Sequence, residues 1–216
     1  MNKSNYNPFL KKLIIKNIFL LLLYIIVIFI LLYLLLNFSD RLEDRLFYII
    51  FVIIIFFALK YKIIDIKKIF AGLKAEIYVN KLLEKNGVIY SKNIIINNRE
   101  IDQVIYYPKL VVLETKYGKG RISKKINKNI TINNKSINKN NIDQVIRNCK
   151  TINIITKKSG YNYIFEPVLC FSNSFGDIVN GEVTIVSGDS IIGYLYENKN
   201  IDIKSAIMLK NFIENI

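Results

Sequence analysis

The stretch that decides the fold is Ile101–Lys116, with the sequence IDQVIYYPKLVVLETK. Its two apolar, β-branched runs flank a Tyr-Pro-Lys break, which is typical of two strands joined by a turn. If the turn is centred on Pro108, Asp102 lies directly opposite Glu114 on the neighbouring strand. Because side chains alternate between the two faces of a strand, Lys116 projects on the same side as Glu114. The pattern therefore predicts two carboxylates and a lysine on one face of a β-hairpin.

Glu114 and Lys116 alone could form a surface ion pair, which stabilises a fold by only ~0–1 kcal/mol. Asp102 in register with them favours a different interpretation. Carboxylates combined with backbone and water oxygens suit Mg²⁺ or Mn²⁺, which need few protein ligands. Such an ion polarises a phosphate oxygen and lowers the pKa of a bound water, while a lysine on the same face stabilises transition-state charge. The hairpin predicts metal-assisted phosphodiester hydrolysis.

Composition excludes several other kinds of site. The 216 residues include no histidine, which removes Ser-His-Asp triads and two-histidine metalloprotease helices. Cys149 and Cys170 are isolated, which argues against a zinc site or a disulfide framework and indicates small core residues in a reducing compartment. The net charge of +14 suggests an anionic partner, either nucleic acid or a membrane surface. An AT-rich coding sequence, which enriches Ile, Asn and Lys, is an alternative origin of that charge.

The N-terminal part predicts a membrane anchor. A run from residue 17 to about residue 37 carries no charge and matches the ~20 residues that cross a ~30 Å hydrocarbon core. The run is longer than the apolar region of a signal peptide, and no small-x-small cleavage site follows it. Leu46–Leu59 is also uncharged, and snorkelling flanks extend it to a second span at about 46–61, with a buried or re-entrant segment as the alternative. Residues 1–68 are therefore predicted to be the anchor.

Charge around the two apolar segments predicts their orientation. The loop between them is acidic on balance, and neither segment contains an ionisable residue, so we expect an anchor and no transport pathway. The positive-inside rule places the N-terminus and the soluble domain in the cytoplasm, at the cell membrane. The flanking lysines are Lys3, Lys11, Lys12, Lys16, Lys60, Lys62, Lys67 and Lys68.

Residues 69–216 have the pattern of a soluble α/β domain. Apolar residues at helical spacing predict a helix over 69–86, closed by Asn86-Gly87. We expect a strand at 88–96, an Asn97-Asn98 turn, the hairpin, a polar loop at 117–141, a helix at 141–155, strands at 163–171 and 182–186, and a helix at 203–213. This order predicts a mixed β-sheet flanked by helices.

A series of short motifs in this order resembles the nuclease-related domain (NERD) family, which belongs to the PD-(D/E)xK, or restriction-endonuclease-like, superfamily. The motifs are Gly72–Glu76, Glu100–Val104, Leu113–Lys116, Asn140–Gln144 and Val168–Ser172. The resemblance covers roughly residues 70–190 and implies a restriction-endonuclease-like core. The chain departs from the family pattern at Gln103, where histidine is common, and at Asn141, where proline is frequent.

The resemblance implies a role for each matching residue. The implied metal ligands are Asp102, Glu114 and the carbonyl of Thr115. The implied catalytic residues are Lys116, Glu76 on the first helix of the domain and Gln144 on the later helix. Without the resemblance, Glu76 and Gln144 could be ordinary exposed helix residues, and Asp102 could cap a turn.

The polar loop offers a surface for nucleic acid. Lys119, Arg121, Lys124 and Lys125 could follow phosphates, although a flexible solvated loop has the same composition. No aromatic residue lies between residues 119 and 139, so we expect no base-stacking surface in that part of the loop.

The leading hypothesis is a membrane-anchored, cytoplasm-facing endonuclease that requires Mg²⁺ or Mn²⁺ and acts on DNA. One alternative is a catalytically inactive module of nuclease fold that tethers nucleic acid or a protein partner to the membrane. The intact acidic pair argues against it, because uncompensated carboxylates repel phosphate unless a metal offsets them. Another alternative is a membrane protein whose soluble part only scaffolds other proteins.

Overall fold

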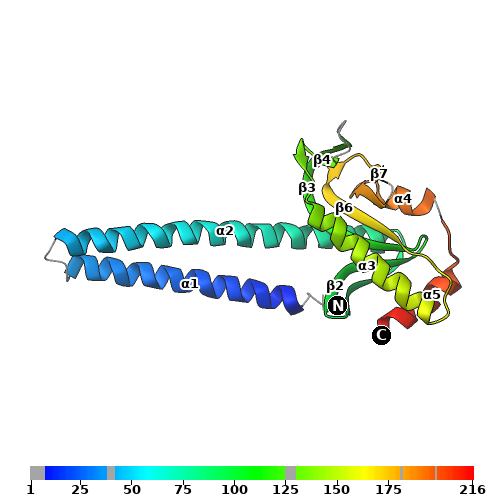
Figure 1. Cartoon of the computed structure of the whole chain (residues 1–216), viewed down its shortest axis with the longest axis horizontal. Helices are drawn as coiled ribbons and strands as arrows, with labels where there is room; N and C mark the ends of the chain where they lie inside the picture. The colour runs from blue at the N-terminus through cyan, green and yellow to red at the C-terminus, as the bar shows by residue number, and fades with distance from the viewer. Residues whose placement is uncertain (1–7, 38–41, 125–129, 181, 198) are drawn as a thin grey trace. The chain divides into compact units, whose positions relative to one another are not determined.

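The structure is a computed structural model that describes residues 8–37, 42–124, 130–180, 182–197 and 199–216 (Figure 1). The chain divides into two compact units, Met1–Ala71 and Gly72–Ile216. The sequence predicted a division between residues 68 and 69.

The first unit contains two long apolar helices, α1 (Pro8–Asn37) and the first part of α2 (Leu42–Lys85). Both are long and apolar enough to cross a membrane, and none of the most apolar part of either is buried inside the protein. Large apolar side chains such as Phe29 and Phe56 are exposed, as expected of side chains that meet lipid. By length and composition, the two helices fit a transmembrane hairpin.

α2 is one continuous helix of 44 residues, whereas the sequence predicted separate helices at 46–61 and 69–86. At 1.5 Å per residue it is about 66 Å long, roughly twice a ~30 Å hydrocarbon core, so the uncharged part before Lys60 is the part that suits a bilayer. No Gly or Pro lies between residues 46 and 71, and the charged turn there is itself helical, with Lys68 Nζ 4.0 Å from Asp65. The helical backbone therefore continues through the change from apolar to charged residues. That change alters only the solvent to which the side chains are suited.

The described residues of the second unit form a mixed sheet of eight strands. Helices flank this sheet, as predicted (Figure 1). The main path runs β1-β2-β3-β6-β8-β7; β1 and β3 pair antiparallel with β2, and β6 pairs parallel with β3 and β8. The strands are β1 (Ile89–Ile96), β2 (Arg99–Tyr107), β3 (Val111–Lys124), β4 (Ile130–Ile132), β5 (Lys135–Ser136), β6 (Glu166–Phe175), β7 (Ile178–Asn180) and β8 (Val183–Ser187). The remaining helices are α3 (Lys139–Lys158), α4 (Ile191–Glu197) and α5 (Ile203–Glu214).

Buried apolar residues join the helices to both faces of the sheet. On one face, Ile152 of α3 and Leu209 of α5 share a cluster with Val104 and Val112 of the hairpin. On the other face, Leu83 of α2 and residues of α4 pack with the hairpin residues that alternate with these. The central hairpin is therefore covered on both sides, and its polar residues are held by a rigid core.

Much of the predicted polar loop at 117–141 is strand. β3 continues to Lys124, and β4 pairs antiparallel with it, with Ile122 opposite Ile132. An Asn133-Asn134 turn then leads into β5, with φ angles of 48° and 64° that match the 50° and 59° at the predicted Asn97-Asn98 turn. Buried isoleucines at 122 and 130 stabilise this extension, because they pack with Phe171 and the start of α3. β7 and α4 were also not predicted.

A bulge interrupts β3 directly after Lys116. β3 pairs with β6 as far as Lys116, and the pairing resumes at Lys119 with a shifted register. Gly118 lies in the gap, where a Cβ atom would come within 2.7 Å of the Phe171 ring. Gly120 follows with a φ of 114°, and a Cβ there would lie 2.8 Å from Asn133. Bulges of this kind redirect side chains beside functional sites.

We predict that Gly118→Ala destabilises the protein by about 1–3 kcal/mol, because the added methyl group would meet a buried ring. Thermal unfolding of the full chain in detergent would measure the change. Gly72→Ala is the matched control, since a Cβ atom at this helical position meets nothing within 4 Å; alanine favours helix over glycine, so no loss is expected. Equal melting temperatures for the two variants would contradict close packing at Gly118.

Candidate active site

Asp102, Glu114 and Lys116 come together where β2 and β3 pair. The register places Gln103 opposite Leu113 and turns at Pro108, as predicted, so the next position outward sets Asp102 against Glu114. The Thr115 N–H donates to Asp102 Oδ2 at 2.9 Å, and Lys116 Nζ donates to Glu114 Oε1 at 2.5 Å. The hairpin thus gathers two carboxylates and one amine.

Glu114 is the most deeply buried of the three. Its side chain is 1% exposed, and only its Oε1 atom is bonded to Lys116. Its other oxygen, Oε2, is buried and has no hydrogen-bond partner among the described residues. A buried carboxylate oxygen without a partner is costly, by about 1–3 kcal/mol or more. This atom is the feature of the site that most needs a further ligand.

Burial controls the electrostatics of this cluster. It raises the pKa of Glu114 to about 7, and repulsion from Asp102 adds to the effect, while Lys116 opposes it. Burial also raises the pKa of Asp102 against the opposing influence of Lys116 and the Thr115 N–H. The carboxylates in turn raise the pKa of Lys116, despite its own burial, and keep it charged. Because one lysine faces several carboxyl groups, binding of either a proton or an added cation would be favoured.

Glu76 and Glu100 extend the acidic cluster. Glu76 lies in the part of α2 that belongs to the second unit, and burial, with repulsion from Asp102 and Glu100, raises its pKa to about 8. Glu100 is half-buried, and burial followed by repulsion from Asp102 raises its pKa. Sequence reasoning assigned no role to Glu100. The signal was its place two residues before Asp102, which puts both side chains on one face of β2.

Gln144 lies on α3 in a neighbouring pocket. The pocket has a volume of about 470 Å³ and is lined by Arg99, Glu100, Gln144, Arg147 and Asn148. Asp102, Glu114 and Lys116 do not line it. Glu100 connects this pocket with the carboxylate cluster, because it lines the pocket and interacts electrostatically with Asp102.

On the opposite face of the hairpin, Gln103 fastens Thr115 to α2. Gln103 is 1% exposed; its Nε2 donates to Asn80 Oδ1 at 3.1 Å, and its Oε1 accepts from Thr115 Oγ1 at 3.0 Å. The position where the family often has histidine therefore holds an amide that fixes the residue between Glu114 and Lys116.

Of the predicted nucleic-acid contacts, Lys119, Arg121 and Lys124 are exposed along β3, and Lys125 lies outside the described residues. Their role stays a prediction. The exposed Lys119, Arg121 and Lys124 lie on β3, the strand that also holds Lys116.

The donor set fits a hard divalent cation held by few protein groups. The described residues contain no group of three or more His, Cys, Asp or Glu side chains placed to hold a metal ion. The family resemblance adds the Thr115 carbonyl to the two carboxylates, and water would supply the remaining ligands. Mg²⁺ commonly takes one or two carboxylates and keeps several waters.

One family of known proteins matches the part of the chain that contains this site. The family model of the nuclease-related domain, NERD, matches residues 71–172. The match runs from the end of α2 through β3 and α3 into β6, so it includes Glu76, Asp102, Glu114, Lys116 and Gln144. No curated protein and no solved structure matches the chain.

We predict that, without metal, the folded protein loses stability as pH rises from about 4.5 to 8. The pKa values of Glu76 and Glu114 lie above their ordinary value of 4.5, so within this range the folded state binds more protons than the unfolded state. Melting temperatures of the full chain in EDTA, measured at pH 5.5 and 8.5, test this.

The variant Glu76→Gln should reduce that difference in melting temperature, because it removes one of the two groups. Glu197→Gln, at an exposed position of α4, is the control and should leave the difference unchanged. An identical pH dependence in wild type and Glu76→Gln would contradict the burial of an acid at position 76.

Proposed function

Because the chain carries a nuclease-related domain, we propose that the protein is a divalent-metal-dependent endonuclease, anchored in the cell membrane, that hydrolyses phosphodiester bonds in DNA. The observation that carries the proposal is the buried, unpaired Oε2 of Glu114 beside Asp102, with Lys116 held on the other oxygen. Burial of two neighbouring carboxylates beside a single lysine is unfavourable unless a proton or a second cation joins them.

Mg²⁺ or Mn²⁺, when bound, would polarise a phosphate oxygen and lower the pKa of the attacking water. Asp102, Glu114 and the Thr115 carbonyl would hold the ion, and the Gln103 bond to Thr115 would fix that residue. These groups need no histidine, in agreement with a chain that has none.

Lys116 would stabilise the negative charge that develops on the phosphate. The surrounding carboxylates raise its pKa, so it is a poor base and a permanent cation at neutral pH. A fixed positive charge in a site shielded from water stabilises a transition state more than the same charge in solvent.

Glu76 would serve as a proton carrier. A carboxyl group with a pKa of about 8 exchanges protons readily near neutral pH, the condition for general acid–base catalysis. Gln144, in the pocket with Glu100, would contact the nucleic acid beside the reacting phosphate.

Nicking of supercoiled plasmid by the full chain in detergent tests the activity. We expect cleavage with Mg²⁺ or Mn²⁺ and none in EDTA. Asp102→Asn, Glu114→Gln and Lys116→Met should each reduce the rate by about 100-fold or more, as expected when one charged group of an active site is lost. Glu197→Gln is the matched acidic control. Cleavage that survives in Asp102→Asn and Glu114→Gln would refute the proposal.

Metal titration separates this activity from an inactive tether. An inactive nuclease-fold module predicts salt-dependent DNA binding but no calorimetric signal with Mn²⁺. The proposed nuclease predicts Mn²⁺ binding that Glu114→Gln abolishes, because the substitution replaces the negatively charged carboxylate with a neutral amide.

The two apolar helices support membrane anchoring, and the flanking lysines support a cytoplasmic domain. Both native cysteines are buried, so single introduced cysteines can report topology with a membrane-impermeant maleimide. We expect Ser39→Cys to react in intact cells of an expression host and Ser159→Cys to react only after permeabilisation. The reverse pattern would place the domain outside the cell.

A further inference from the structure

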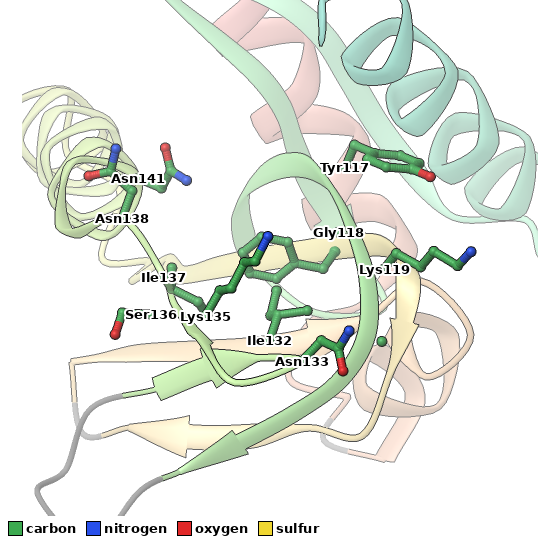
Figure 2. A pocket seen from close by; sticks show the side chains of 12 residues that line it. Tyr117, Gly118, Lys119, Ile132, Asn133, Lys135, Ser136, Ile137, Asn138 and Asn141 are labelled. Carbon is green, nitrogen blue, oxygen red and sulfur yellow. The ribbon is translucent and has the colours of Figure 1, made fainter.

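Two hollows meet at Tyr117, the residue directly after Lys116. The first, shown in Figure 2, has a volume of about 600 Å³ and lies between the β3 bulge and the β5–α3 connection. The second has a volume of about 390 Å³ and is lined by residues of α2 and β6, among them Lys74 and Phe175. Tyr117 lines both hollows and is 50% exposed. Each volume lies within the range of about 300–1,000 Å³ typical of small-molecule sites.

The first hollow is suited to a phosphate. Its lining contains Lys119 and Lys135 and no acidic residue. Asn138 and Asn141, at the start of α3, line the side opposite Lys119 (Figure 2). Asn138 is the N-cap of this helix, whose first turn carries no acid, and the partial positive charge of a helix N-terminus favours an anion. Two cations and a helix start therefore line the same cavity, with the Lys119 ammonium directed away from the helix start (Figure 2).

The same hollows are suited to nucleobases. Phe171 is buried in the wall of the first, and Phe175, in the second, is 57% exposed. Gly118 lets β3 approach the Phe171 ring, and the bulge releases Tyr117 from regular pairing with β6. Exposed aromatic rings beside cations are the usual means of holding single strands, because every base has a face on which to stack.

In the second hollow, the single acid is already engaged. Asp189 accepts a hydrogen bond from the Tyr78 hydroxyl at 2.8 Å, and Lys74 lines the same cavity. The polar side chains that remain are those of Ser172 and Asn173 of β6, because the Ser174 hydroxyl donates to the Phe171 carbonyl at 2.8 Å. Neutral donors and acceptors of this kind suit the edges of a base.

We propose that the two hollows are neighbouring nucleotide subsites, which hold successive nucleotides of a single-stranded stretch of DNA on either side of Tyr117. That the bound DNA strand leads to the carboxylate cluster rests on the proposed function. Binding of the strand in the two hollows requires no cleavage. These subsites assign Tyr117 a stacking role and Lys135 a phosphate contact, and neither residue stood out in the sequence.

Fluorescence anisotropy of the full chain in detergent tests the subsites, with EDTA present to prevent cleavage. The probes are a labelled twelve-nucleotide oligothymidine, an abasic oligomer of the same length and a duplex of the same length. We expect the oligothymidine to bind tighter than the duplex. Tyr117→Ala should weaken its binding by about 10-fold, as loss of a stacked base does, while Tyr117→Phe retains it. On the abasic oligomer, Tyr117→Ala should have no effect.

The salt dependence of the same binding tests Lys135. Removing one phosphate contact to a single strand should reduce the slope of log affinity against log salt by about 0.7. Lys135→Gln should show this change, and Lys150→Gln, at an exposed position of α3, should not. Melting temperatures of all variants would confirm that they are folded.

Three results would overturn the subsites: no binding of any single strand, unchanged affinity in Tyr117→Ala, or an equal loss with the abasic oligomer. These results are independent of the plasmid assay. Nicking without single-strand binding would refute the subsites alone, and the expected binding without metal-dependent nicking would refute the hydrolytic function alone.

Discussion

The pairing of β2 with β3 about Pro108 is the constraint on which the site depends. Because strand side chains alternate, this one register decides that Asp102, Glu114 and Lys116 share a face and that Gln103 and Thr115 share the other. A shift by one residue would send the carboxylates into the opposite core cluster. The apolar residues between them, packed under helices on both faces, make such a shift very unfavourable.

The same burial that fixes the register creates the electrostatic problem. Burial of Glu114 and Asp102 makes two negative charges difficult to keep there. The fold offsets this with one lysine and with a main-chain donor. What remains is an acidic cluster in a protein of net charge +14, which explains why total charge is a poor guide to this site.

The hairpin was predictable because its signal is local: an apolar alternation, a proline and two carboxylates equidistant from it. The strands β4 and β5 were not predictable. Strands of three and two residues contain too few alternations of apolar and polar side chains to be distinguished from a lysine-rich loop. The continuity of α2 was missed because a change in polarity was interpreted as a break, although no helix-breaking residue accompanies it. Gln144 was assigned to the cluster from its motif alone, and its distance from Glu114 depends on how α3 packs, which one sequence does not specify.

Gln103 has a consequence for how the hairpin responds to pH. An amide does not titrate near neutral pH, so the link from α2 to Thr115 is indifferent to mild acidification. The chain has no imidazole, and both of its thiols are buried in the core. The attachment of Thr115 to α2 is therefore the same at neutral and at mildly acidic pH, whereas the Glu114 carboxyl group on the other face titrates within that range.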